Sequence, residues 1–229
     1  MAFKYSEAVP WGRSFDEYRR MFGLTEQELN LSIIGCGDGP ASFNAEMSRL
    51  GYRVVSCDPL YQLSKSQIQE RIDATYEDIM RQTRENLHKF VWTSIKTPED
   101  LGRVRMAAME SFLEDFDNGK RDGRYITGEL PTLPFGSDVF DLAVCSHFLF
   151  LYSGILTLEF HQLAIEEMCR VAHEVRIFPL LNYNAEPSQY LESLLKGLSD
   201  AGYNTVIESV SYEFQRGGNQ MLRVRKANR

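Results

Sequence analysis

Hydrophobic and polar positions in the first quarter of the chain follow an order that predicts a βαβ unit. A short apolar run at residues 31–34 ends at glycine, as a buried strand does, and residues 40–50 then place apolar side chains on one helical side. A second strand-like run at 52–57 ends in Asp58. Because such crossovers are right-handed, we expect the two strands to be parallel.

A long segment without strand-like alternation follows the second strand. Its runs 68–90 and 98–116 are rich in Glu, Arg, Gln, Met and Leu, with apolar residues at helical spacing. Residues 62–124 are too many for an ordinary connection in an α/β unit, so we interpret them as a helical insertion that acts as a lid.

The remaining pattern completes an α/β domain. Short helices are expected within 11–29, further strands at 125–127, 140–145, 174–180, 205–214 and 220–225, and further helices at 156–172 and 188–201. This order predicts a Rossmann-like, doubly wound α/β fold with a mainly parallel seven-stranded sheet, an antiparallel C-terminal strand and the insertion after the second strand. We expect a single domain over residues 1–229, with 1–30 as an N-terminal helical arm.

Composition narrows the classes of protein. Hydrophobic residues make up 43% and charged residues 25%, and the net charge is -7. We therefore expect no nucleic-acid partner, which usually needs a basic face. No segment has the pattern of a signal peptide or a membrane span, so we expect a cytoplasmic protein. The four cysteines lack a CxxC spacing, which favours reduced, buried thiols and no metal site. The oligomeric state stays open, with a homodimer as one alternative.

A glycine loop, Gly35-Cys36-Gly37-Asp38-Gly39, stands at the end of the first predicted strand. Ligands of such sheets lie at the carboxyl ends of the strands, and glycine lets the backbone approach a ligand that a Cβ would push away. Asp58 ends the neighbouring strand, where a carboxylate can accept hydrogen bonds from both hydroxyls of a ribose. The loop and Asp58 together indicate a nucleotide-like ligand.

Two classes of nucleotide compete for this loop. A dinucleotide loop uses GxGxxG, whose last glycine allows close helix packing while free N–H groups face a pyrophosphate. This chain has Pro40 at that position, and proline has no N–H to offer. The spacing GxGxG, with Pro40 opening the helix, favours a ligand without phosphate. A glycine turn that serves only helix packing is the structural alternative.

Four motifs in this order resemble the class I S-adenosylmethionine-dependent methyltransferases, especially the small-molecule type. They are Ile33-Ile34-Gly35-Cys36-Gly37-Asp38-Gly39, then Asp58, then Gly128-Glu129-Leu130 with Leu133-Pro134-Phe135, and finally Val139-Phe140-Asp141-Leu142-Ala143-Val144-Cys145-Ser146. The resemblance covers most of the chain outside the insertion. It implies a Rossmann-like fold, S-adenosylmethionine as cofactor and a small molecule as methyl acceptor.

The resemblance also implies which residues contact the cofactor. They are Gly35, Cys36, Gly37, Gly39, Asp58, Pro59, Glu129, Leu130 and Ser146. Two positions depart from the family. Ile33 stands where an acidic residue often orders the loop and the ligand's amino group, and Glu129 stands where aspartate is usual. We therefore expect carbonyls near Gly35 and Ser146 to bind the amino group.

Side chains around the expected methyl group are candidates for chemistry. His147 follows the fourth predicted strand, and an imidazole titrates near neutral pH, so His147 is a candidate base for a hydroxyl, amine or acid acceptor. Its alternative role is packing beside the cofactor. In the arm, Arg13 is a candidate partner for the methionine carboxylate, and Tyr18 for closing over the sulfonium.

The insertion supplies candidates for an acceptor cavity. Phe90, Trp92 and Met106 are apolar residues that would line it, although a stripe of this kind is more often core. Three functions stay open: a methyltransferase, a non-catalytic S-adenosylmethionine-binding or interaction module on the same fold, and a NAD-dependent oxidoreductase. The lack of an acid at Ile33 and of a clear base motivates the second, and Pro40 opposes the third.

Overall fold

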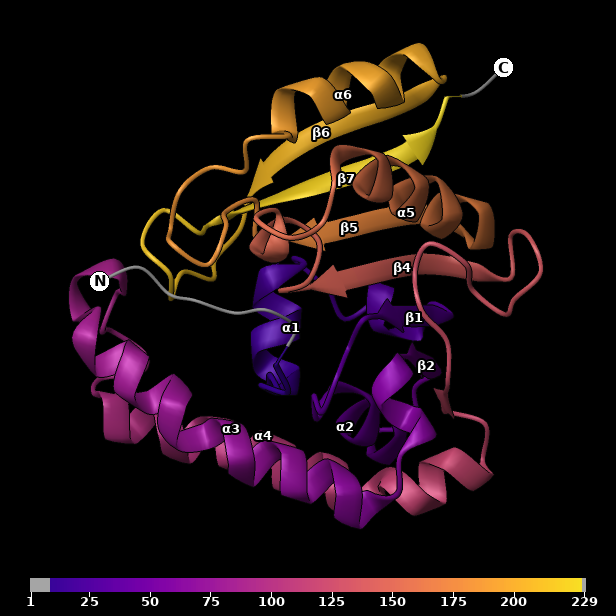
Figure 1. The fold of residues 1–229 in the computed structure, drawn as a ribbon. Helices are drawn as coiled ribbons and strands as arrows, with labels where there is room; N and C mark the ends of the chain where they lie inside the picture. Colours follow the sequence, from indigo (N-terminus) through magenta and orange to yellow (C-terminus); the bar gives the residue numbers. More distant parts are fainter. Residues whose placement is uncertain (1–8, 228–229) are drawn as a thin grey trace.

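A seven-stranded sheet forms the centre of the computed structural model, which describes residues 9–227 (Figure 1). The strands are β1 Ile33–Cys36, β2 Val54–Cys57, β3 Tyr125–Ile126, β4 Phe140–Ser146, β5 Ala172–Phe178, β6 Tyr203–Ser209 and β7 Gln220–Lys226. Their order is β3-β2-β1-β4-β5-β7-β6, with β7 antiparallel to both neighbours and all the other pairings parallel. The fold class expected from the sequence is confirmed. Residues 1–8 of the expected arm lie outside the described residues.

Helices cover both faces of this sheet. They are α1 Phe15–Met21, α2 Phe43–Arg49, α3 Lys65–Glu85, α4 Pro98–Arg121, α5 Leu158–Val171 and α6 Leu191–Asp200. The helices α5 and α6 pack on one face through a core that includes Ile165 and Leu194, whereas α1 and α2 pack on the other through Tyr18 and Phe43. The four cysteines are free and buried. In the described part of the chain, no helix is long and apolar enough to span a membrane.

The helix after the glycine loop begins later than expected. Pro40 was predicted to open it, but α2 begins at Phe43. The N-terminal arm occupies the intervening turn, because the Ser42 N–H donates to the Arg13 carbonyl at 3.0 Å. Gly12 lies directly against the turn: a Cβ on Gly12 would come 2.1 Å from the Pro40 carbonyl oxygen. The arm is therefore packed onto the loop that we expected to bind the ligand.

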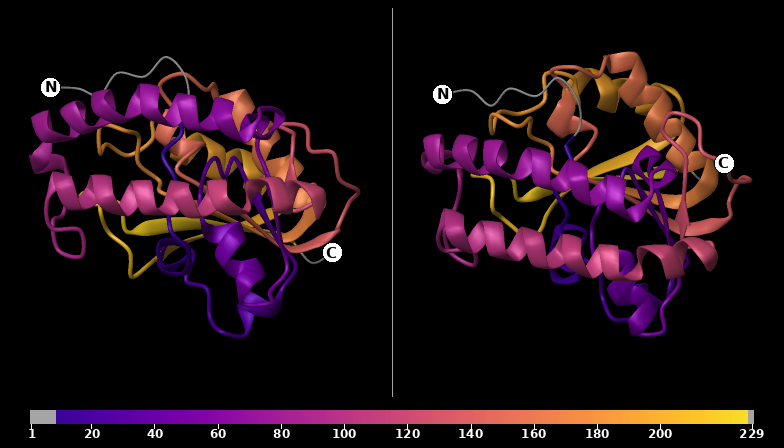
Figure 2. Two further views of the ribbon diagram at one scale, coloured as in Figure 1. Left: turned by 90° about the horizontal axis from the view of Figure 1, so that it is seen from below. Right: turned by 60° about the horizontal axis from the view of Figure 1, so that its bottom comes forward.

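The insertion is a pair of long helices, α3 and α4, that lie side by side (Figure 2). Each helix starts at a hydroxyl cap, since Ser64 accepts from the Gln67 N–H and Thr97 from the Asp100 N–H. The connection between them pairs with the loop between β6 and β7, where the Val91 N–H donates to a carbonyl at 2.7 Å. The far end of the helical pair is thus attached to the C-terminal half of the sheet.

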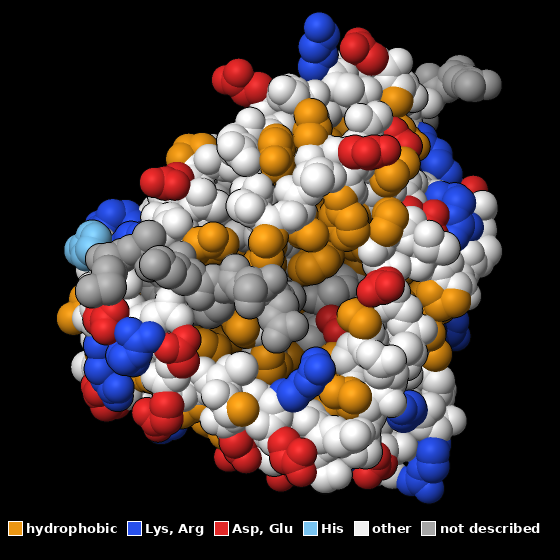
Figure 3. All heavy atoms as spheres, viewed as in Figure 1, with side chains coloured by type: hydrophobic (Ala, Val, Ile, Leu, Met, Phe, Trp, Pro, Cys, Tyr) orange, Lys and Arg blue, Asp and Glu red, His pale blue; other side chains and the backbone are white. Residues whose placement is uncertain are grey.

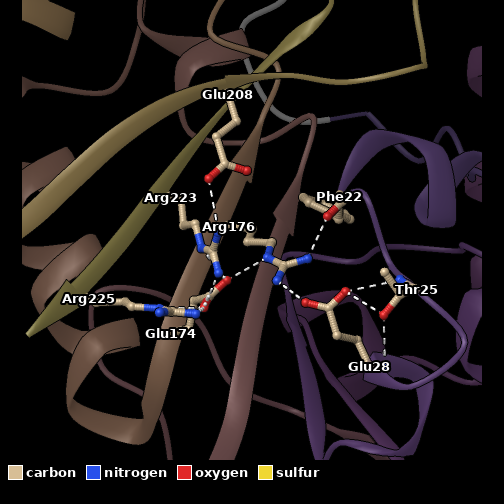
Figure 4. Close-up of polar contacts among 8 residues, drawn as sticks. All are labelled: Phe22, Thr25, Glu28, Glu174, Arg176, Glu208, Arg223 and Arg225. Atoms are coloured by element: carbon tan, nitrogen blue, oxygen red, sulfur yellow. Dashed lines mark hydrogen bonds and ion pairs between the residues drawn. The ribbon is translucent and has the colours of Figure 1, made fainter.

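An ion-pair network fixes the segment after α1 to the open face of β5, β7 and β6 (Figure 4). Arg176 on β5 donates to the Phe22 carbonyl at 2.7 Å and pairs with Glu28 and Glu174. Glu174 also accepts from Arg223 and Arg225 on β7, and Arg223 pairs with Glu208 on β6. These contacts hold the C-terminal end of α1 against the sheet, and Tyr18 of the same helix reaches Asp38 in the loop after β1.

Candidate functional site

A cavity of about 490 Å³ lies at the carboxyl ends of the strands, between the glycine loop and the helical insertion. Hydrophobic side chains gather around a hollow in the middle of this face (Figure 3). Its walls come from the arm, the loops after β1, β2 and β4, the insertion and the loop between β6 and β7. The residues that line the cavity are far apart in the sequence. The cavity therefore forms only when these segments come together in the fold.

The glycine loop bends so that a carboxylate lies over its first residue. Gly37 and Gly39 have φ of 68° and 53°, which L side chains rarely adopt. A Cβ on Gly35 would meet the Asp38 carboxyl group at 1.8 Å. Gly35 therefore serves the close approach of Asp38, and the Cys36 side chain points into the core instead of the cavity.

Asp58 orders this loop from the end of β2. One oxygen of its carboxylate accepts from the Gly39 N–H at 2.8 Å, and the other accepts from the Leu60 N–H at 2.7 Å. Burial raises the pKa of Asp58 to about 6, although these two hydrogen bonds oppose the rise. Each carboxylate oxygen has a further lone pair, and Asp58 lines the cavity, as binding of a ribose requires.

Asp38 is a functional candidate that the sequence analysis missed. Asp38 is 7% exposed and lines the cavity, and its carboxylate accepts from the Tyr18 hydroxyl at 2.8 Å and the Ser56 hydroxyl at 2.6 Å. Burial raises its pKa to about 6. No cationic side chain within residues 9–227 forms an ion pair with Asp38, so its negative charge is unmatched. The signal in the sequence was the acid inside the loop, three residues after Gly35, the glycine that makes room for its carboxyl group.

Arg13 is a cation in the same cavity, with a charge opposite to that of Asp38. Its guanidinium donates to the Trp11 carbonyl, while its buried Nε has no hydrogen-bond partner. Burial and the neighbouring Arg105 lower its pKa to about 10. Throughout the described ranges, no carboxylate lies within ion-pair distance of Arg13. Among the described residues, a cation without an ion-pair partner therefore lines the cavity together with a carboxylate that also has none.

A buried ion pair attaches the insertion to the arm. Arg105 of α4, which is fully buried, donates to both carboxylate oxygens of Glu17 of α1, at 2.5 and 2.7 Å. Glu17 also accepts from the Tyr212 hydroxyl at 2.8 Å. Arg105 holds the pKa of Glu17 well below its usual range. Because Arg105 lines the cavity and Glu17 does not, the pair presents its positive end to a ligand.

His147 lies at the cavity in an uncommon backbone conformation, with φ of 52°. The ring Nδ1 of His147 is 2.9 Å from the Ser146 hydroxyl, and the backbone N–H of His147 donates to the Phe178 carbonyl at 2.7 Å. The expectation that it titrates near neutral pH is wrong, because burial, Arg13 and Arg105 hold its pKa well below the usual value. The ring is therefore neutral at physiological pH and a weak base.

The other expected cofactor residues fall into two groups. Tyr18, Gly37, Gly39, Pro59, Glu129, Leu130 and Ser146 line the cavity with Asp58, Arg13 and His147. Gly35 and Cys36 do not contribute to its lining. In the insertion, Phe90 lines the cavity as expected, whereas Trp92 packs on Phe90 and Phe214, and Met106 packs in the core beneath the helices. For these last two residues the alternative holds that such a stripe belongs to the core.

The strand order, the glycine loop after β1 and the aspartate after β2 give this chain the Rossmann-like fold of the class I methyltransferases. No family model matches the sequence. The chain is 36% identical over 222 residues to the uncharacterised protein MJ0045 of Methanocaldococcus jannaschii, covering 96% of this chain and 97% of that protein. It belongs to the same family as MJ0045.

Two solved structures illustrate a distant similarity to this chain. A TehB-like S-adenosylmethionine-dependent methyltransferase from Corynebacterium glutamicum is 15% identical with a TM-score of 0.49, covering 93% of this chain and 87% of that one. The magnesium protoporphyrin IX methyltransferase of Synechocystis with bound S-adenosylmethionine is 14% identical with a TM-score of 0.44, covering 93% and 91%. The fold assignment therefore depends on the strand order, and the function on the residues of the site.

Proposed function

We propose that this protein is a methyltransferase that uses S-adenosylmethionine and acts on a small molecule. The observation that carries the proposal is the pair of unmatched charges in one cavity. Among residues 9–227, Asp38 has no cationic side chain and Arg13 no carboxylate within ion-pair distance, and both interact with Tyr18. Burying such charges is unfavourable unless a ligand compensates them. The α-amino acid end of S-adenosylmethionine carries both complementary charges.

Three acidic or basic groups would then hold the cofactor. Asp58 would accept from the ribose hydroxyls, Asp38 from the ammonium group, and Arg13 would donate to the carboxylate. In this arrangement Asp38 replaces the acid that the resemblance expects at Ile33. Exposed Glu129 and the buried Leu130 would flank the adenine.

The chemistry needs few catalytic groups. When bound, S-adenosylmethionine supplies a methyl group on a positively charged sulfur, so an acceptor lone pair forms the new bond as the carbon–sulfur bond breaks. The chain contributes placement of the acceptor and exclusion of water by the arm and the helical insertion. His147, being neutral, can accept a hydrogen bond from an acceptor but removes a proton poorly.

The same charges disfavour a dinucleotide. A pyrophosphate would face the carboxylates of Asp38 and Asp58 at the loop, and the Gly39 N–H already donates to Asp58. Pro40 has no N–H for a phosphate oxygen. We therefore expect NAD not to bind at concentrations at which S-adenosylmethionine saturates the protein.

Calorimetric titration tests the proposal with two ligands that differ only at one end. S-adenosylhomocysteine carries the amino acid group, whereas 5′-methylthioadenosine lacks it. Arg13→Gln and Asp38→Asn should each lower the affinity for S-adenosylhomocysteine by roughly 10- to 100-fold, which corresponds to the loss of a charged hydrogen bond. The affinity for methylthioadenosine should stay nearly unchanged. Asp58→Asn should lower the affinity for both ligands, because both contain the ribose.

NAD is the control ligand in these titrations. No heat with S-adenosylhomocysteine from the folded wild-type protein, or micromolar binding of NAD, would contradict the proposal. Equal losses for both adenosine ligands in Arg13→Gln and Asp38→Asn would show that the two charges do not bind the amino acid group. Cofactor binding without methyl transfer across a broad acceptor panel would favour a non-catalytic module.

A further inference from the structure

The cavity continues beyond the residues assigned to the cofactor, and a group of aromatic side chains lines its remaining part. Phe148, Tyr152, Phe160 and Tyr183 come from the segment after β4, from α5 and from the loop after β5. From the opposite side, Phe90 of the insertion and Phe214 of the loop between β6 and β7 stack at 4.9 Å between ring centroids. Such walls suit a flat, apolar molecule.

Aliphatic residues of the two long helices complete this half. Ile79 and Leu101 line the cavity from α3 and α4, and both are buried. The carboxylates that line the cavity within residues 9–227 are Asp38, Asp58 and Glu129, all on the side assigned to the cofactor. An acceptor in the aromatic half would therefore meet no negative side chain from the described part of the chain.

Arg105 supplies positive charge to this half of the cavity. It is fully buried, its Nε has no hydrogen-bond partner, and its two terminal nitrogens donate to Glu17 behind it. Burial is the largest cause of the lowered pKa of His147, and the charges of Arg13 and Arg105 lower it further, while Glu17 opposes them. A positive field of this kind stabilises an oxyanion and opposes a protonated amine at the same place.

We infer that the acceptor is a flat, apolar molecule with a weakly acidic hydroxyl group, such as a phenol or an enol, and that it reacts as its oxyanion beside Arg105. The hydroxyl proton leaves to solvent, the oxygen lone pair forms the bond to the methyl carbon, and the neutral thioether leaves with the electrons of the broken carbon–sulfur bond. Arg105 stabilises the oxyanion electrostatically, so His147 is not required as a strong base. This inference rests on the proposed function and names its substrate class.

Three probes that share the naphthalene ring system test the inference: 2-naphthol, 2-naphthylmethylamine and naphthalene. Each is titrated into the wild-type protein saturated with S-adenosylhomocysteine. We expect 2-naphthol to bind at least about tenfold more tightly than the protonated amine. Absorbance of the naphtholate should show that binding lowers the pKa of 2-naphthol by at least about one unit, as a nearby cation does.

A charge-neutral double variant, Glu17→Gln with Arg105→Gln, provides the matched comparison. It should still bind naphthalene, while the pKa of bound 2-naphthol should return to within about half a unit of its value in buffer. If this variant does not fold, the comparison of probes on the wild-type protein stands alone.

Two results on the wild-type protein would overturn the inference. One is that none of the three probes binds the loaded protein, and the other is that the amine binds as tightly as 2-naphthol or that the pKa of 2-naphthol does not fall. Because S-adenosylhomocysteine must bind first, failure of that step would count against the proposed function, whereas failure of the probes alone would count against the acceptor class.

Discussion

Asp38 is a residue whose buried charge lowers the stability of the ligand-free protein. Its pKa is about 6 in the folded chain against an ordinary value of 3.8, because burial disfavours its charged form. Between these two values the folded chain holds a proton that the unfolded chain has released, so the free energy of unfolding falls as the pH rises. Above about pH 6 the charged carboxylate therefore costs stability in the absence of a ligand.

We expect Asp38→Asn to be more stable than wild type at pH 8 by on the order of 1–3 kcal/mol. The difference should shrink toward zero below about pH 4, where both proteins are neutral at this position, and thermal unfolding across this pH range measures it.

Asp141→Asn is the control with the opposite sign. Asp141 accepts from the Ser32 N–H and hydroxyl, both at 2.8 Å, and its pKa is lowered, so it stabilises the fold at pH 8 and its removal should destabilise the protein there. A less stable Asp38→Asn protein at pH 8 would argue that its carboxylate has a purely structural role.

The sequence predicted the acid at the end of β2 but not the acid inside the loop. Asp58 is recognisable because strand, loop and carboxylate are local in the sequence. The environment of Asp38 depends on Tyr18 and Ser56, which reach it from α1 and β2, and on the lack of a cationic partner for it within residues 9–227. Tertiary contacts of this kind have no signature in spacing. The lowered pKa of His147 was missed for the same reason, since its largest cause is burial in the folded chain, and Arg13 and Arg105, which add to it, lie in other segments.

Among the elements, α4 depends on one buried ion pair for its attachment to α1. Removing one partner of such a pair leaves a buried charge without compensation, whereas removing both is far less costly. Glu17→Gln should therefore lower the free energy of unfolding at pH 7 by about 3–5 kcal/mol, measured by urea titration.

The double variant Glu17→Gln with Arg105→Gln should recover much of that loss. Glu85→Gln is the matched control, because Glu85 pairs with exposed Arg81 at 2.9 Å on the surface of α3 and its loss should matter much less. Equal effects of Glu17→Gln and Glu85→Gln would show that the buried pair does not hold α4 in place.

Element boundaries were predicted better within the sheet than around the insertion. The helical spacing of residues 62–124 correctly predicted helices there, and the structure resolves them into α3 and α4. Which side chains face the cavity could not be deduced, because a helical stripe has the same pattern whether it faces a ligand or a core. Met106 and Trp92 satisfy that pattern and pack elsewhere, while Ile79 and Leu101 face the cavity.

At the scale of the whole molecule, the cavity exists only because distant segments meet. The arm packs on the glycine loop through Gly12, the insertion joins the arm through Arg105, and its far end pairs with the loop between β6 and β7. A ligand in the cavity would contact all three of these parts. Binding should therefore stabilise the molecule as a unit, as any ligand that prefers the folded state does.

A crystal structure of the protein with S-adenosylhomocysteine tests the central claim most directly. The account predicts the ligand ammonium group about 2.7–3.2 Å from the Asp38 carboxylate, its carboxylate at the same distance from the Arg13 guanidinium, and its ribose hydroxyls on Asp58. An ammonium group bound only by backbone carbonyls, with Arg13 turned away from the ligand, would contradict it.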